Sequence, residues 1–381
     1  AQALFGIGVI AGPAIGPVLG GYLTDTLGWR WIFFINLPVG IFAVLMTIIF
    51  LPRDTRGQLL HASVDWLGIG LLAVGLGCFQ TMLEEGQQND WFGSRFIVMM
   101  AAGATIGAAL FIWRELSTDH PAVDLRVLRH KSLAAGSVYS LILGMGLYGV
   151  MFAVPIFVQD YLHFTALQSG MVLLPGAIAS AVMMIVMGKV AGRVDARVLI
   201  ALGALTLVSC VVLLSRINPD TSTTTLFWPL VLRGLGTVMM FLPLSLATLG
   251  SLPKGDVAAG SGFYNLTRQM GSSIGIAIIT TLLAHREAVH RAVLVENVSA
   301  TNPALSPRME LLTGNFLQHS GDPVQAHHQA FAVIDQLVNA QALLLSFADV
   351  FFYVAATFIV TLPILLLLGQ GRNRDAAAAA H

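Results

Sequence analysis

Ten apolar stretches of about 20 residues, separated by polar connections, constrain this chain more than any other feature of its sequence. A helix needs about 20 mostly apolar residues to cross a bilayer, whereas a transmembrane barrel strand needs about ten with alternating polarity. The sequence therefore predicts an all-α integral membrane protein with about ten transmembrane helices. The expected spans are residues 3–23, 31–51, 66–83, 95–113, 133–158, 168–188, 197–215, 225–250, 257–283 and 346–369.

The composition supports this class. Hydrophobic residues make up 56% of the chain, charged residues only 10%, and the mean hydropathy is +0.78. Soluble globular proteins carry about 25% charged residues. Lysine and arginine balance aspartate and glutamate at 20 each, which predicts no nucleic-acid partner. Cys78 and Cys210 lie inside apolar runs and are expected to pack there, with no disulfide and no metal.

The basic residues of the connections predict the orientation, because cytoplasmic connections are enriched in lysine and arginine. One set of alternate connections holds twelve of them: Arg53, Arg56, Arg114, Arg126, Arg129, Lys131, Lys189, Arg193, Arg197, Lys254, Arg372 and Arg374. The other set holds six: Arg30, Arg95, Arg216, Arg286, Arg291 and Arg308. The first set is therefore expected in the cytoplasm, together with both ends of this chain.

The first span has glycine at every fourth position from residue 8 to residue 20, and proline at positions 13 and 17. Such a stripe bares the backbone, so that a neighbouring helix can approach it closely in lipid. The prolines bend the helix, which membrane helices tolerate when neighbours satisfy the freed carbonyls. The spacing alone leaves two interpretations open: an ordinary helix-packing face, or the moving contact of a transporter.

The stretch GPAIGPVLGGYLTDTLGWRWIFFINLPVGIFAVLM (12–46) resembles the antiporter motif and the following helix of the major facilitator superfamily. More narrowly, it is similar to the fourteen-helix drug:proton antiporter branch, the EmrB/QacA type. DWLGIGLLAVGLG with LEEGQQNDW (65–91) resembles that branch's two inserted helices, and GSGFYNLTRQMGSSIGIAI (260–278) resembles part of its C-terminal half. By this resemblance the antiporter motif comprises Gly8, Gly12, Pro13, Gly16, Pro17, Gly20 and Gly21.

The resemblance implies a major facilitator fold in which the first span of this chain is the family's fifth helix. Helices one to four are then expected to be absent from this chain. Residues 1–51 become a two-span remnant of the N-terminal bundle, and residues 52–131 the two inserted spans with a cytoplasmic connection. Residues 132–284 become the first five spans of the C-terminal bundle, 285–345 an extracytoplasmic segment, and 346–381 the last span and a cytoplasmic tail.

The function implied by the resemblance is proton-coupled efflux of hydrophobic or amphipathic compounds by alternating access, across the inner membrane of a bacterium. A proton gradient would drive it without a cofactor, and the partners would be small substrates, protons and the lipid bilayer. Two alternatives stay open: a transporter of one specific metabolite, and a non-functional truncated fragment. No enzyme is expected, because no nucleophile and base or metal ligands cluster at one depth.

Two arginines inside spans need a partner or a wet cavity, because an arginine at the bilayer centre costs about 2.5–3.5 kcal/mol on insertion scales. Arg233 lies about two turns into its span, and Arg268 lies near the middle of the next. Asn265 and Gln269 share a face with Arg268, so all three are expected to line or organise the substrate path. Interhelical hydrogen bonding is the other interpretation. Both arginines are also candidate counter-charges in proton coupling.

Proton coupling needs a carboxyl group that trades a proton against substrate. Within this chain Asp349 is the first candidate, because an unbroken apolar run follows it, and Asp160 is the second. Both lie near outer ends of spans, and the carrier is expected on the absent helices. Asp65 and Asp256 are interpreted as N-caps of helices.

Methionine and aromatic residues suggest where hydrophobic substrates would bind. Tyr148, Phe152 and Gln159 share one face of the fifth span, and Met240 lies in a cluster with Met239 and Phe241 on the eighth. Thioether chains repack cheaply around ligands of varied shape. Tyr148, Phe152, Gln159 and Met240 are therefore expected along the substrate path, with core or lipid packing as the alternative.

The turn GKVAGRVDAR (188–197) resembles the family's repeated cytoplasmic motif. It predicts a cytoplasmic gate made of Gly188, Gly192, Arg193, Asp195 and Arg197, in which Asp195 pairs with one of the cations. The alternative is a basic turn placed by the positive-inside bias.

Residues 285–345 are too polar to cross the membrane. Their apolar positions suggest that the ninth helix continues beyond the bilayer and that an amphipathic helix returns toward it. The histidines of this segment lack metal-ligand spacing. The length of the segment and the resemblance predict a docking surface for a periplasmic adaptor protein.

Overall fold

The computed structural model describes residues 2–50, 65–118, 121–253, 255–299, 302–303 and 305–361, and for residues 2–14, 319, 320 and 361 it describes the backbone alone. Throughout these ranges the regular structure is helical. The longer helices are α1 Gln2–Leu27, α3 Asn36–Phe50, α4 Trp66–Glu85, α5 Arg95–Ser117, α6 Lys131–Ile156, α7 Ala166–Val190, α8 Ala196–Leu214, α9 Thr223–Leu249, α10 Val257–Glu296, α11 Leu305–Ser320 and α12 Pro323–Thr361. Shorter pieces are α2 Trp31–Phe34, η1 Trp91–Gly93, η2 Leu125–Arg129 and the π-helical η3 Phe157–Tyr161.

The helices agree with the expected membrane spans. Among the described residues, eight helical segments are long and apolar enough to cross a bilayer: Trp31–Phe50, Trp66–Glu85, Arg95–Ser117, Lys131–Tyr161, Ala166–Val190, Ala196–Leu214, Thr223–Leu249 and Pro323–Val360. The two other expected spans, residues 3–23 and 257–283, lie in α1 and α10. The expected last span is described only as far as residue 361. The all-α integral membrane fold is thus confirmed.

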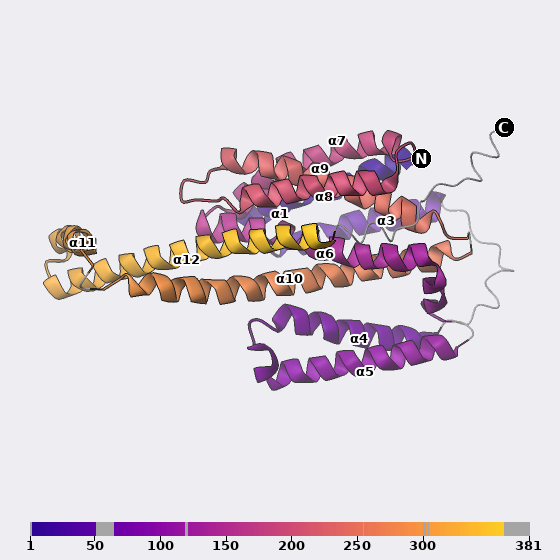
Figure 1. The fold of residues 1–381 in the computed structure, drawn as a ribbon, viewed down its shortest axis with the longest axis horizontal. Helices are drawn as coiled ribbons and strands as arrows, with labels where there is room; N and C mark the ends of the chain where they lie inside the picture. The colour runs from indigo at the N-terminus through magenta and orange to yellow at the C-terminus, as the bar shows by residue number, and fades with distance from the viewer. Residues whose placement is uncertain are drawn as a thin grey trace.

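Successive connections lie at alternate ends of the bundle, so the helices run up and down (Figure 1). Helices α10 and α12 extend well beyond the others and carry α11 at their tip (Figure 1). With 40 and 39 residues at about 1.5 Å per residue, each is about 60 Å long, twice the thickness of the hydrocarbon core. The predicted continuation and return of these helices are confirmed, whereas α11 has no counterpart in the sequence analysis.

Close backbone contacts at glycines hold the bundle together. A Cβ at Gly271 or Gly275 of α10 would collide with the backbone of Leu141 or Met145 in α6. On the other side of the bundle, Gly234 of α9 is pressed equally closely against Gly176 of α7. Without a hydrophobic effect between helices in lipid, such backbone contacts supply much of the packing energy.

The helix pair α4–α5 lies at one side of the bundle, next to α10 (Figure 1). The two helices cross closely at Gly75 and Gly107. A hydrogen bond of 2.6 Å joins the Ser273 hydroxyl of α10 to Oε1 of Gln80 in α4. The pair is therefore attached to the bundle along the same helix that carries Arg268.

Candidate translocation path

Arg268 lies half-buried on α10, where its guanidinium faces α9. Its Nη2 donates a hydrogen bond of 3.0 Å to Asn265 Oδ1, one turn earlier, and its Cζ lies 4.9 Å from the ring centroid of Phe241. Within the described part of the chain, no carboxylate lies within ion-pair distance of this guanidinium. Gln269 is exposed beside it. The structure thus joins a cation, an amide and an aromatic face.

The crossing of α6 and α10 fixes the position of Arg268 in the bundle. Gly144 of α6 faces the backbone carbonyl of Arg268 so closely that no Cβ fits between them. The Ser140 hydroxyl, one turn earlier on α6, donates to the Tyr264 carbonyl at 3.4 Å. Because both ends of the segment that carries Arg268 are held by α6, the guanidinium is positioned by backbone contacts.

Arg233 lies elsewhere, at the junction of α7, α8 and α9. One of its guanidinium nitrogens is 3.4 Å from the position that a Cβ on Gly176 would occupy, and the buried Cys210 of α8 lies close to it. The described residues offer it no carboxylate within 4 Å. The two arginines therefore lie in different surroundings. Arg233 lies between α7, α8 and α9, whereas Arg268 lies on α10 and faces Phe241.

The four residues expected along the substrate path occupy different surroundings. Met240 is completely buried in the hydrophobic core and packs against Gly203 of α8, so it does not line an open path in this conformation. Tyr148 is 37% exposed, and Phe152 is half-buried, both on α6. Gln159 lies in η3, beyond Pro155, and its amide donates to the Ser169 hydroxyl of α7 at 3.2 Å.

The two candidate proton carriers lack the surroundings expected of one. Asp349 of α12 is an ion-pair partner, because its Oδ2 accepts from Arg286 Nε at 2.6 Å and lies 2.8 Å from His290 Nε2. Asp160 is exposed in η3. Asp349 therefore ties α12 to α10, and Asp160 lies at the surface.

The antiporter-motif helix α1 packs against α7 through positions 17, 21 and 25, one helical turn apart. The Pro17 carbonyl is in close contact with Gly170, and Gly21 with the backbone of Ala166. The Leu167 N–H donates to Asp25 at 2.9 Å, and this bond at the start of α7 holds the pKa of Asp25 below its usual value. The contact face is thus rotated from the predicted stripe. Around Gly16 and Gly20 the structure shows open space, while Gly8, Gly12 and Pro13 lie outside the residues with described side chains.

The expected gate turn lies between α7 and α8. Asp195 caps α8, where it accepts from the Arg197 backbone N–H at 2.9 Å. The side chain of Asp195 thus serves as a helix cap, and its predicted pairing with a cation of this turn stays a prediction. A Cβ at Gly188 or Gly192 would meet open space, and Arg193 is exposed.

A cavity of about 670 Å³ lies between the N-terminal ends of α7 and α9. Its walls are almost wholly apolar and are formed by Phe164, Gln168, Met171, Val172, Pro175, Thr223, Thr224, Phe227 and Trp228. None of the expected path residues lines it. The polar face at Arg268 and this apolar cavity are therefore separate features.

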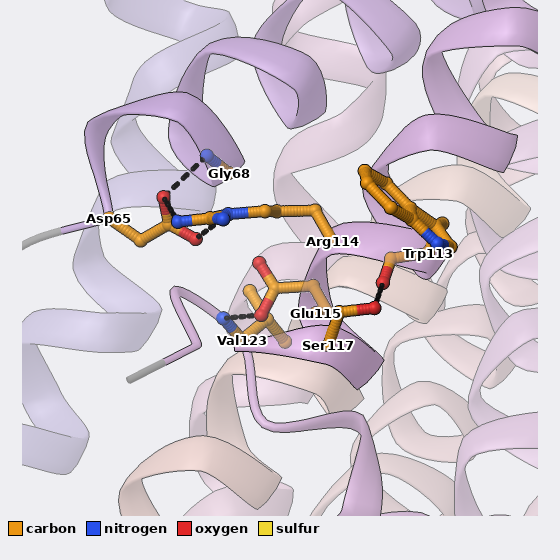
Figure 2. A network of polar contacts seen from close by, with 7 residues as sticks. All are labelled: Asp65, Gly68, Trp113, Arg114, Glu115, Ser117 and Val123. Carbon is orange, nitrogen blue, oxygen red and sulfur yellow. Dashed lines mark hydrogen bonds and ion pairs between the residues drawn. The ribbon is translucent and has the colours of Figure 1, made fainter. Parts of the chain in front are cut away.

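A second polar cluster joins the ends of α4 and α5 (Figure 2). Asp65 caps α4 as predicted, through a 3.0 Å bond from the Gly68 N–H, and Arg114 binds the same carboxylate. These donors hold the pKa of Asp65 below its usual value, with the Arg114 hydrogen bond the larger cause. Asp256 makes no N-cap bond and instead lies 3.0 Å from His130 Nε2, so its predicted capping role is wrong.

Sequence reasoning missed two features. Glu115 is buried, although its position beside Arg114 in the last turn of α5 resembles a solvated helix end. Phe241 was grouped with the methionines, but its contact with Arg268 joins α9 to α10 and depends on the helix crossing. A glutamate one residue after an arginine at the end of a span is a weak sequence signal for the buried Glu115. The contact between Phe241 and Arg268 has no signal in the sequence.

The comparisons with known proteins decide the family. A model of the Major Facilitator Superfamily matches residues 1–276. This chain belongs to the Major Facilitator Superfamily. It is 32% identical over 367 residues to the multidrug export protein EmrB of Escherichia coli (strain K12), and the match covers 96% of this chain and 70% of that protein.

Two further relatives have similar coverage. The fatty acid resistance protein FarB of Neisseria gonorrhoeae is 28% identical over 367 residues, covering 96% of this chain and 71% of FarB. The colistin resistance protein EmrB of Acinetobacter baumannii is 28% identical over 372 residues, covering 97% of this chain and 72% of that protein. Together with the apolar helices, these relatives identify a multi-pass protein of a bacterial inner membrane.

Proposed function

We propose that this protein is a proton-coupled exporter of hydrophobic or amphipathic compounds that works by alternating access. Membership of the Major Facilitator Superfamily supports a transport role, and the names of the relatives refer to multidrug export and to resistance against fatty acids and colistin. Facilitator folds place their substrate sites near the bilayer midplane, between two bundles that rock against each other. The glycine contacts of α1 with α7 suit such a moving contact.

The observation that carries this proposal is the group of Arg268, Asn265 and Phe241. The half-buried guanidinium of Arg268 lies beside an aromatic ring, and no carboxylate of the described residues lies within ion-pair distance of it. The group therefore offers both a charge and a flat apolar surface. An amphipathic compound can use both. We infer that this group lines the path, and that Arg268 and Arg233 serve as counter-charges to the proton-carrying carboxyl group. The burial of Met240 favours a packing role for that residue.

The experiment is a susceptibility panel in an efflux-deficient bacterium that expresses the complete gene. Cells with the wild-type protein should tolerate several unrelated amphipathic compounds, and Arg268→Gln should abolish this tolerance. Arg216→Gln, which changes an exposed arginine between α8 and α9, is the matched control and should retain it. Tolerance of a single compound, or unchanged tolerance in Arg268→Gln at equal expression, would contradict the proposal.

We further propose that the basic connections face the cytoplasm, so that α11 and the outer halves of α10 and α12 project into the periplasm as a docking surface for an adaptor protein. Two interactions stiffen this projection: the pairing of Asp349 with Arg286, and a 2.7 Å ion pair between Arg291 and Asp335. Deletion of residues 305–320 should leave membrane insertion intact and abolish copurification with a periplasmic adaptor. Unchanged copurification would exclude α11 as the contact.

A further inference from the structure

The ends of α4 and α5 enclose two carboxyl groups and a single cation (Figure 2). Arg114 donates to both oxygens of Asp65, from Nε to Oδ2 at 3.1 Å and from Nη2 to Oδ1 at 3.3 Å. The Gly68 N–H donates a third bond to Oδ1. Both carboxylate oxygens of Asp65 therefore accept hydrogen bonds, and the bidentate contact occupies the guanidinium of Arg114.

Glu115 lies beside this pair with only 1% of its surface exposed. Its Oε2 accepts one bond of 3.3 Å, from the backbone N–H of Val123 in the segment that leads to α6. Its Oε1 is buried and has no hydrogen-bond partner. This oxygen lies 2.9 Å from the position that a Cβ on Gly68 would occupy, and Asp65 Oδ2 lies 2.8 Å from the same position. The two carboxyl groups thus share the space above Gly68.

An ionised Glu115 would be poorly stabilised there. It would be a second anion next to Asp65, and it lies in the last turn of α5, where the helix dipole disfavours negative charge. The charged groups that act on it from the described residues are Asp65 and Arg114, and that cation is already committed. Burial disfavours a carboxylate whose second oxygen has no donor. A metal ion would need more oxygen ligands than this space offers.

We propose that Glu115 is a proton-binding site, which carries a proton on its unpartnered Oε1 at neutral pH. The proton comes from water at this face of the membrane and forms an O–H bond that points toward the Asp65 carboxylate. When the pH rises, the proton returns to water.

This assignment adds a proton-binding site at the ends of α4 and α5, and it does not depend on which compound is transported.

The test is infrared spectroscopy of the complete protein in lipid nanodiscs, titrated from about pH 4 to about pH 9. The wild-type protein should show a carboxylic-acid C=O band at neutral pH, and Glu115→Gln should remove that band. Glu296→Gln, at an exposed carboxylate of α10, is the control and should leave the band unchanged. A spectrum of Glu115→Gln identical to that of the wild type at neutral pH would show an ionised Glu115 and overturn the proposal.

A second variant tests the surroundings of the site. Asp65→Asn removes the neighbouring anion and frees Arg114, so the pH at which the band disappears should fall by about one unit or more. An unchanged or higher midpoint would contradict the proposed geometry.

Discussion

Gly271→Ala tests whether backbone contact between α6 and α10 holds the bundle together. The new methyl group would overlap the Leu141 carbonyl oxygen and would lie 2.8 Å from its carbonyl carbon, where ordinary contact begins at 3.4 Å. The atoms are backbone and cannot rotate away, so the helices must separate by about 0.6 Å or more. Neighbouring contacts at Gly144 and Gly275 would loosen with them. Overpacking of this kind costs about 1–3 kcal/mol.

Gly262→Ala is the matched control on the same helix, because the position of its methyl group has no atom within 4 Å. There alanine should leave stability unchanged or raise it by up to about 1 kcal/mol through helix propensity. The assay is unfolding of both purified variants in mixed micelles with increasing SDS, monitored by circular dichroism. If Gly271→Ala unfolds at the same midpoint as Gly262→Ala, the backbone contact does not carry the α6–α10 interface.

Three further outcomes are expected. The pKa of Asp65 is lowered in the folded protein. The stabilising effect of the Asp65 carboxylate is therefore fully present above its unfolded pKa of about 4 and is lost as the pH falls through the lower folded pKa. In acid unfolding, Asp65→Asn should lack this pH dependence of stability. Neutralising Asp349 and Asp160 to asparagine in the complete protein should leave proton-driven efflux largely intact, and its abolition would refute their assignment as structural and exposed groups. Phe241→Leu removes the aromatic face under the Arg268 guanidinium, a contact worth about 0.5–2 kcal/mol, and should change the export of aromatic compounds. Met240→Leu, at a buried position, should not change it. Equal effects of the two variants in susceptibility assays would contradict the assigned positions.

The membrane fold could be predicted because each span satisfies a local requirement, a length of apolar sequence that matches the bilayer. The same is true of the Asp65 cap, since a capping residue acts within its own first turn. The extension of α10 was also readable, because its apolar positions continue past His285. Features set by hydrogen bonds and contacts along one helix are therefore accessible from sequence.

Contacts between helices were predicted less well, because they depend on helix rotation. A rotation by one residue places positions 17 and 21 of α1 on α7, where the glycine repeat favoured 16 and 20. Met240 and Phe241 are adjacent in sequence, yet one is buried against α8 and the other meets Arg268 of α10. Composition suggests that such residues matter, but only the crossing of helices decides which of them faces the path.

The central claim is that export is coupled to protons along the face that carries Arg268. The most direct measurement is uptake of an amphipathic fluorescent substrate into proteoliposomes that contain the complete protein in the inverted orientation and an imposed pH gradient. The account predicts accumulation that collapses with a protonophore, disappears in Arg268→Gln and persists in Arg216→Gln. Accumulation that is indifferent to the pH gradient, or that proceeds unchanged in Arg268→Gln, would contradict it.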